Sequence, residues 1–232
     1  MPNAVPHTPY GMTEGLLLTD ITLDGIRDAS REAGARGGAD AGGVCVGLPT
    51  ATTAVRISAI DALGAPTGES SDRPNVTGEI VVSAPHIKSG YDRLWITDRA
   101  SRLGTRPGER WHRTGDVGHL DDAGRLWVEG RLPHVAVTAN SVVTPVATEQ
   151  RIEKIAAVAR AAVVGIGPRG TQVLVAIVET VAGSRRVSLA PEELAVTVRA
   201  AAVLPLAAVL VVPTLPTDIR HNSKIDRSRL SR

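Results

Sequence analysis

The stretch Trp111–Arg131, WHRTGDVGHLDDAGRLWVEGR, gives the strongest indication of the fold. It combines a Thr-Gly-Asp turn that ends at Asp116, a hairpin-like turn at Asp121–Gly124 and a final Gly-Arg pair. Turn residues of this kind between short apolar runs predict a compact β unit. The unit would hold Asp116 and Arg131 at its two ends, where the two charged groups either grip one small polar ligand or are simply solvated.

The residues before this unit also favour β-structure. From Gly43 to Arg131 the chain has short apolar segments that are rich in β-branched residues and bounded by Gly, Pro and Asp, as strands usually are. Ile80 and Val82 would share one face of their strand and Val81 would take the other. We therefore expect an antiparallel β-barrel-like or sandwich subdomain, preceded by a loop with one short helical piece. The predicted strands lie within 44–49, 53–60, 77–85 and 124–131, and the loop covers 22–43.

The pattern changes just after Arg131. Thr144 suits the N-cap and Pro145 the first position of a helix, because that position needs no backbone N–H donor. Two strands joined by a tight Pro-Arg-Gly turn are expected within 161–180, and a second helix begins at Pro191. The apolar stripe of the first helix would comprise Ile152, Ile155, Ala156 and Ala159, and a third strand would lie within 207–216.

The sequence thus predicts an α+β protein with two parts. Residues 1–131 would end in the β subdomain, and residues 132–232 would form a small domain with helices on a three-stranded sheet. The single cysteine, Cys45, lies in an apolar run, which favours a buried, inert thiol and is compatible with a reducing cytoplasm. We therefore expect a cytoplasmic protein.

The charge pattern argues against two classes of partner. The formal net charge is only +2, and the basic residues are scattered except in the tail, so the chain lacks a nucleic-acid footprint with stacking aromatics. No window approaches the roughly 20 apolar residues of a membrane span. We expect no nucleic-acid partner and no membrane span.

Three short motifs carry chemistry. YGMTE at Tyr10–Glu14 offers an aromatic face for a base, a hydroxyl for a phosphate and a carboxylate for Mg²⁺, although alone it would be a polar loop. WHRTGD, with its downstream Gly-Arg, supplies Asp116 and Arg131. HNSKIDR, at 221–227, places Lys224 between polar residues.

In this order and spacing, the motifs resemble those of the adenylate-forming superfamily of acyl- and aryl-CoA synthetases, peptide-synthetase adenylation domains and luciferases. The resemblance covers essentially the whole chain but only the later part of a family member. It implies ATP and Mg²⁺ as cofactors and a carboxylic acid as substrate. It also implies a fold in which the β subdomain of the large domain precedes a small mobile C-terminal domain.

The resemblance assigns a role to each motif residue. Asp116 would hold the ribose hydroxyls, and Arg131 would approach the ribose and phosphate. Lys224 would reach the acyl carboxylate and the α-phosphate, where a mobile point charge stabilises the charge that develops during adenylation. In the first motif, Tyr10 would stack on adenine, the adjacent Gly11 would belong to the nucleotide site, Thr13 would bind the α-phosphate and Glu14 would ligate Mg²⁺.

Departures from the family pattern are also informative. The family's phosphate-binding loop would lie before residue 1, so we expect the chain to need the first part of the same enzyme and to be inactive alone. Pro133 stands at the usual hinge position, and its fixed φ disfavours the large domain rotation. Asn140 replaces the glycine that lets a CoA pantetheine pass. Exposed apolar surface allows a homo-oligomer.

These departures are most like the branch of synthetases that serves bacterial long-chain olefin biosynthesis. That branch activates a β-hydroxy acid with ATP and closes it to a β-lactone without CoA, which is coherent because intramolecular attack has a high effective molarity. Acyl-CoA synthetases, carrier-loading enzymes and a non-catalytic module that keeps the fold remain alternatives. The residues do not decide whether His112, His134 or His221 acts as a base, because a lone histidine is more often structural.

Overall fold

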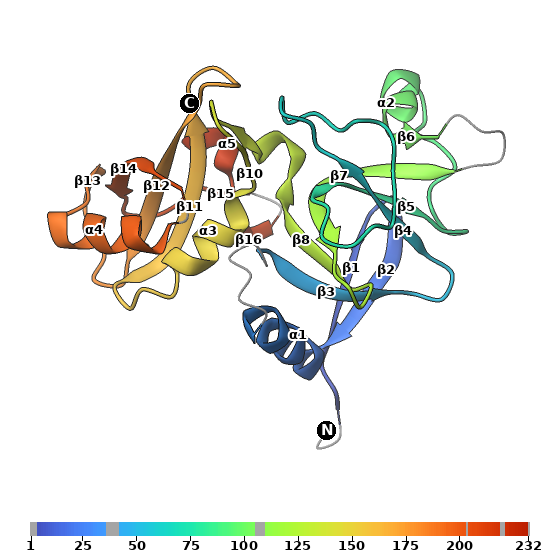
Figure 1. Cartoon of the computed structure of the whole chain (residues 1–232), viewed down its shortest axis with the longest axis horizontal. Coiled ribbons are helices and arrows are strands. Elements are labelled where there is room, and N and C mark those ends of the chain that lie inside the picture. Colours follow the sequence, from blue (N-terminus) through green and yellow to red (C-terminus); the bar gives the residue numbers. More distant parts are fainter. Residues whose placement is uncertain (1–3, 36–41, 105–109, 203, 219–220, 232) are drawn as a thin grey trace. The chain divides into compact units, whose positions relative to one another are not determined.

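The computed structural model describes residues 4–35, 42–104, 110–202, 204–218 and 221–231. The chain divides into two compact units (Figure 1). The N-terminal unit comprises Met1–Asp61 and Ala65–Leu132, and the C-terminal unit comprises Ala62–Gly64 and Pro133–Arg232. Both units mix helices with sheets that are mostly antiparallel.

An eight-stranded sheet dominates the N-terminal unit, with the order β1-β2-β3-β8-β7-β5-β4 and β6 paired to β7. In the described part of the chain, β1 and β4 end this path without pairing to each other, so the expected barrel-like sheet is not a closed barrel. The four strands predicted from short apolar segments are all present. The strands are β1 (His7–Met12), β2 (Gly15–Thr22), β3 (Val44–Pro49), β4 (Ala54–Ala59), β5 (Gly78–Ser83), β6 (Arg102–Leu103), β7 (Trp111–Leu120) and β8 (Leu126–Arg131).

The strand β5 is an interior strand next to the edge strand β4, and its residues 80–82 form a continuous apolar run. It pairs with β4 on one side and β7 on the other. Ile80 and Val82 belong to one apolar cluster with Leu18, Ile57 and Leu126, as their expected common face requires. Val81 is also fully buried, because both faces of this strand are covered.

The residues after β2 form a longer helix than the sequence suggested. Instead of a loop with a short helical piece, α1 runs from Leu23 to Ala35 and lies beside β2 and β3 (Figure 1). Its apolar positions Ile26, Ala29 and Ala33 pack with Cys45, which is buried as predicted. Within the described residues no helix is long and apolar enough to cross a membrane. A second, short helix, α2, spans Trp95–Ala100, and a 3-10 turn, η1, spans Leu132–His134.

The C-terminal unit is built on a sheet with the order β11-β12-β14-β13. The sheet has four strands rather than the predicted three, because the two-residue β13 adds to the edge of β14. A strand of that length leaves no periodic signal. The elements are β9 (Ala136–Val137), β10 (Val142–Val143), α3 (Pro145–Ile152), β11 (Val158–Ile166), β12 (Val173–Thr180), β13 (Ser188–Leu189), α4 (Glu192–Ala201), β14 (Leu206–Val211), β15 (Thr217–Asp218), β16 (His221–Ile225) and α5 (Arg227–Leu230).

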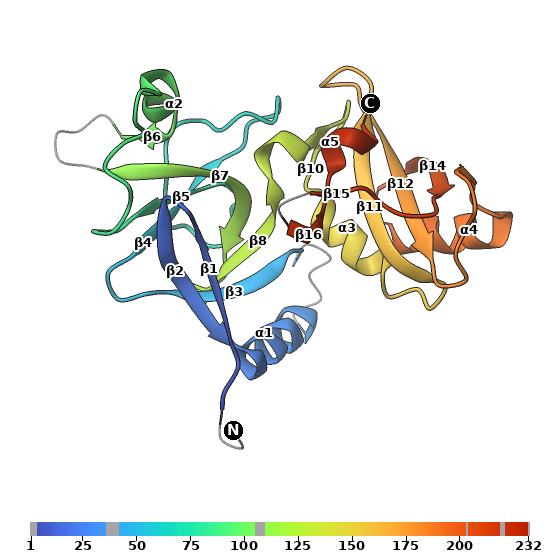
Figure 2. The same ribbon diagram turned by 180° about the vertical axis from the view of Figure 1, so that it is seen from behind.

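Alternate residues of β11 and β12 supply the two faces of this sheet. Ala161 and Val163 face a cluster that includes Ile152 of α3 and Val198 of α4. Ala162 and Val164 face a second cluster with partly buried residues of the tail, where α5 lies beside β11 (Figure 2). The sheet is therefore covered on both faces.

The first predicted helix is shorter than its apolar stripe suggested. Thr144 and Pro145 are the N-cap and first residue of α3, as expected, but the helix ends at Ile152. Ile155, Ala156 and Ala159 are therefore not on a helix, and Ala159 lies in β11. Alanine fits either structure, and here the β-branched residues that follow pair with β12 and decide in favour of a strand.

Candidate functional site

The β7–β8 hairpin brings the two charged ends of the opening stretch together. The carboxylate of Asp121 accepts the backbone N–H groups of Ala123 and Arg125, both at 2.9 Å, which closes the predicted turn. Asp116 and Arg131 then stand directly opposite each other in the ladder. Their side chains form an ion pair, with 3.2 Å between Arg131 Nε and Asp116 Oδ1.

The Thr-Gly-Asp turn shapes the backbone that presents Asp116. The Thr114 hydroxyl donates to the Ile80 carbonyl at 2.8 Å and accepts the Asp116 N–H at 3.0 Å. Gly115 between them has φ +71°, a conformation that other residues rarely adopt. The motif therefore fixes a local irregularity in β7, and the Asp116 carboxylate remains 21% exposed.

Tyr10 reaches the same carboxylate from the other end of the sequence. It lies near the end of β1, and its hydroxyl donates to Asp116 Oδ2 at 2.8 Å. Burial, together with the charge of Asp116, raises the pKa of Tyr10 far above its usual value. The tyrosine is therefore a neutral donor at all physiological pH values, and it orients the carboxylate without neutralising it.

The rest of the first motif forms the turn between β1 and β2. Thr13 is exposed at this turn, and Glu14 is half-buried. The Tyr91 hydroxyl donates to Glu14 Oε1 at 2.7 Å, and the Lys88 N–H donates to the Glu14 carbonyl at 2.7 Å. The hydrogen bond from Tyr91 lowers the pKa of Glu14, so its carboxylate is ionised at neutral pH. Gly11, the motif's remaining predicted site residue, lies in β1.

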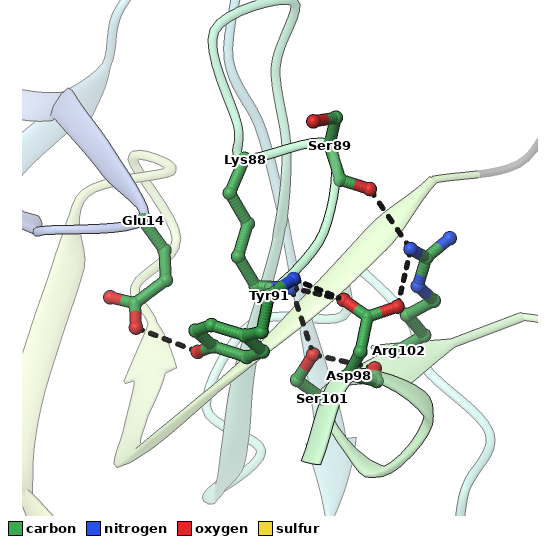
Figure 3. Close-up of polar contacts among 7 residues, drawn as sticks. All are labelled: Glu14, Lys88, Ser89, Tyr91, Asp98, Ser101 and Arg102. Carbon is green, nitrogen blue, oxygen red and sulfur yellow. Dashed lines mark hydrogen bonds and ion pairs between the residues drawn. The ribbon is translucent and has the colours of Figure 1, made fainter. Parts of the chain in front are cut away.

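A polar network centred on Asp98 of α2 holds the loop that carries Lys88 and Tyr91 (Figure 3). Asp98 Oδ1 accepts from Lys88 Nζ at 3.0 Å and from the Tyr91 N–H at 3.1 Å. Its Oδ2 accepts from Arg102 Nη2 at 2.5 Å. The hydrogen bond from Lys88 is the main reason why the pKa of Asp98 lies below its usual range, so the network is charged at neutral pH.

The same loop borders a cavity of 310 Å³ that is also lined by Trp111 and His112. His112 is buried, and its burial lowers the pKa of the imidazole. The positive charge of Lys88 lowers it further. His112 is therefore neutral at pH 7.

The carboxylate of Glu14 is compatible with the expected Mg²⁺, although it does not belong to a cluster of protein ligands. Within the residues that the structure describes, no group of three or more His, Cys, Asp or Glu side chains could hold a metal. Mg²⁺ does not need such a group, because it is usually bound by one or two carboxylates together with substrate phosphates and water. A single ionised carboxylate beside the exposed hydroxyl of Thr13 suits that mode.

The predicted lysine, Lys224, lies in β16 of the C-terminal unit. Its side chain lies outside the described part of the structure, as does that of His221. The segment is anchored just beyond it, where Arg227 donates from Nε to Glu149 Oε1 at 3.0 Å and from Nη2 to Oε2. Glu149 Oε1 also accepts the Val163 N–H at 2.8 Å, so the pair is tied to β11.

The two positions that depart from the family pattern lie early in the C-terminal unit. Pro133 is in the short turn η1, and its ring fixes φ there. Asn140 is exposed in the connection between β9 and β10, where its N–H donates to Thr138 Oγ1 at 3.3 Å. Both positions are therefore in connecting segments rather than in the core.

Comparison with known proteins gives a consistent result. No protein-family model matches the chain. An olefin beta-lactone synthetase of Stenotrophomonas maltophilia (strain K279a) is 38% identical over 238 residues, which cover 97% of this chain and 41% of that protein. In sequence and in fold, the chain corresponds to the late part of an adenylate-forming enzyme.

Solved structures of adenylate-forming enzymes share this fold. ATP-bound MatB from Rhodopseudomonas palustris matches with a TM-score of 0.73 and 21% identity, over 97% of this chain and 40% of that one. O-succinylbenzoate coenzyme A synthetase (MenE) from Bacillus subtilis, in complex with ATP and magnesium ion, matches with a TM-score of 0.69 and 22% identity. The match covers 97% of this chain and 41% of that one. The chain thus spans about two fifths of the length of each of these three proteins.

The structure brings together some of the predicted site residues of this chain. Tyr10, Asp116 and Arg131 form one contact group, and Glu14 forms another with residues that the sequence did not single out. The missed residues are Tyr91 and the Asp98 network. One signal could have found Tyr91, since it is one of only two tyrosines in a chain without Phe.

Proposed function

We propose that this chain supplies the residues that bind the ribose and the metal, together with a lysine, in a site that activates a carboxylic acid with ATP and Mg²⁺. The reaction would form an acyl-adenylate and release pyrophosphate. The observation that carries this proposal is the placement of Asp116 between Tyr10 and Arg131, which brings residues of the first two motifs together. The similarity to the olefin beta-lactone synthetase supports it.

In this proposal Asp116 accepts the ribose hydroxyls. A carboxylate accepts about four hydrogen bonds, so the contacts with Tyr10 and Arg131 do not by themselves fill it. Arg131, which is 57% exposed, can turn its guanidinium toward a phosphate. The ring of Tyr10 offers its face to adenine while its hydroxyl keeps Asp116 in place.

Thr13 and Glu14 serve the phosphates, and Lys224 serves the reacting carboxylate. Mg²⁺ held by Glu14 would supply charge neutralisation at the triphosphate. An oxygen of the acid attacks the α-phosphorus, the bond to the β-phosphate oxygen breaks, and pyrophosphate leaves. Lys224 stabilises the negative charge that builds up at that centre.

We further propose that the acid is a β-hydroxy fatty acid and that the product is a β-lactone. The substrate's own hydroxyl would attack the acyl carbonyl of the adenylate, lose its proton and displace AMP. No second substrate then needs a channel or a large domain rotation, which agrees with Asn140 and Pro133. An acyl-CoA synthetase would need both, and it is the competing assignment.

The test uses the complete gene product that contains this chain. We would incubate it with ATP, Mg²⁺ and a racemic long-chain β-hydroxy acid, with and without CoA, and analyse the products by mass spectrometry. We expect a product at the mass of the acid minus water that forms without CoA and disappears in Lys224→Ala. Lys154→Ala is the matched control, because Lys154 is an exposed lysine of the same unit.

Each result has a clear meaning. A thioester that forms only with CoA would overturn the β-lactone proposal and leave acid activation standing. Absence of AMP release with any acid tested would overturn acid activation itself and favour a non-catalytic module. Equal losses in Lys224→Ala and Lys154→Ala would remove the specific role of Lys224.

A further inference from the structure

The loop from Ala84 to Tyr91 contacts the motif turn at several points. The Lys88 N–H and the Tyr91 hydroxyl donate to the backbone and side chain of Glu14, respectively, each at 2.7 Å. A side chain at Gly15 would collide with Ile87, so the glycine allows a close approach of this loop. The Glu14 backbone and its carboxylate are therefore both held from the same loop.

Asp98 in turn fixes the loop. It accepts the Tyr91 N–H and the Lys88 ammonium group, and Ser101 Oγ accepts from the same ammonium at 3.1 Å (Figure 3). Lys88 Nζ also lies 3.9 Å from the centre of the Tyr91 ring, a cation–π distance. The tyrosine is thus held at its backbone by Asp98 and at its ring by Lys88.

The Tyr91 hydroxyl donates to one oxygen of the Glu14 carboxylate, Oε1, at 2.7 Å. A phenol hydroxyl orients a carboxylate without placing a positive charge beside it. Because the hydroxyl occupies Oε1, the other oxygen is the one best placed to bind a cation.

We propose that Tyr91 is a positioning residue for Glu14 as a metal ligand, and that Asp98 acts on the metal through Tyr91. This inference rests on the proposed function, in which Glu14 holds Mg²⁺ at the ATP phosphates. Residues that hydrogen-bond a metal ligand fix its orientation, and replacing them typically weakens metal binding or activity by about 10–100-fold.

The test measures metal binding directly. The complete gene product would be titrated with Mn²⁺ in the presence of α,β-methylene-ATP, an analogue that resists cleavage at the α-phosphate, and free Mn²⁺ would be read by electron paramagnetic resonance. We expect Tyr91→Phe, which keeps the ring and removes only the hydroxyl, to weaken Mn²⁺ binding about tenfold. Glu14→Gln should weaken it at least as much.

Two further variants separate positioning from folding. Thr77→Val is the matched control, because it removes a hydroxyl that donates to a different carboxylate, Glu129, at 3.0 Å. It should leave Mn²⁺ binding unchanged. Asp98→Asn should weaken Mn²⁺ binding less than Tyr91→Phe does, and the double variant should bind like Tyr91→Phe alone, since both changes act through one hydroxyl. Circular dichroism verifies that each variant is folded.

The outcomes distinguish this inference from the proposed function. If the unmodified protein binds the Mn²⁺–nucleotide complex, Glu14→Gln weakens binding and Tyr91→Phe matches the unmodified protein, the positioning role is wrong and the function stands. Unchanged binding in Glu14→Gln would also overturn the inference. If the unmodified protein binds no Mn²⁺–nucleotide complex, the proposed function fails with it.

Discussion

Replacing Arg227 by methionine should destabilise the C-terminal unit selectively. The side chains of Arg227 and Glu149 are 17% and 6% exposed, and the guanidinium makes two contacts with the carboxylate. Removing one partner of a buried pair costs about 3–5 kcal/mol, and the exposure of Arg227 points to the lower end, about 3 kcal/mol. The Val163 N–H, which donates to the same carboxylate at 2.8 Å, cannot replace the lost charge.

The distribution of aromatic residues makes this loss measurable in one unit at a time. All three tryptophans and both tyrosines lie in the N-terminal unit. Fluorescence in a urea titration therefore follows that unit, while far-ultraviolet circular dichroism follows both. With an m-value of about 1–3 kcal/mol per M, the circular-dichroism transition of the C-terminal unit should move down by about 1–3 M urea, and the fluorescence transition should stay in place.

The matched control is Arg229→Met, which removes an exposed arginine from the same short helix. Its effect should stay within about 0.5 kcal/mol. In the double variant Arg227→Met with Glu149→Leu, both charges are gone, so we expect the loss to be smaller than the sum of the single losses by about 1–3 kcal/mol. Equal midpoints for Arg227→Met and Arg229→Met would refute the reasoning that this buried pair anchors the segment after Lys224.

Three further predictions concern the N-terminal unit. Burial alone would raise the pKa of Asp121, but hydrogen bonds from Trp127 and an arginine outweigh it and lower the pKa. The stability that the Asp121 carboxylate contributes is therefore present above the pKa of this group in the unfolded chain. It is lost as the pH falls through the lower pKa of the group in the folded chain. Asp121→Asn should lower the free energy of unfolding by about 1–3 kcal/mol at pH 7. It should also make the urea midpoint depend less on pH below about pH 4; an unchanged pH dependence would contradict this. Burial lowers the pKa of His112, so the folded state resists protonation. Stability should fall as the pH drops below about 6.5, and His112→Asn should remove that part of the curve; a midpoint curve that still matches the unmodified chain would count against it. Asp116→Asn should weaken AMP binding by the complete gene product roughly 10- to 100-fold in calorimetry, because the amide replaces a charged acceptor held by Tyr10; an equal dissociation constant would exclude the ribose role.

The sequence could predict what is encoded locally. The β7–β8 hairpin follows from its turn residues, and the order of the three motifs indicated the fold of the late part of an adenylate-forming enzyme. The helix α1 was underestimated because Gly25 and Gly34 mask its apolar spacing. The stripe through Ala156 and Ala159 misled because strand pairing with β12 outweighed helical periodicity.

The same distinction between local and long-range contacts applies to the residues of the candidate site. Asp116 and Arg131 were expected at the two ends of one hairpin, and register alone makes them neighbours. The contact of Tyr91 with Glu14 joins residues 77 positions apart, and it depends on how one loop packs against another. A single sequence carries no local signal for such a pairing, because the pairing depends on tertiary packing and not on the spacing of the two residues in the chain.

The use of tyrosine at both carboxylates follows a single physical requirement. The chain has two tyrosines, and each donates its hydroxyl to a carboxylate of the proposed site, Tyr10 to Asp116 and Tyr91 to Glu14. A lysine in either place would orient the carboxylate but also cancel its charge, which the ribose hydroxyls and the cation need. A phenol whose pKa is raised by burial orients the carboxylate and leaves its charge intact. Replacing Tyr10 or Tyr91 by phenylalanine should therefore disorder the carboxylate, whereas replacing either by lysine should keep it ordered and still abolish ligand binding.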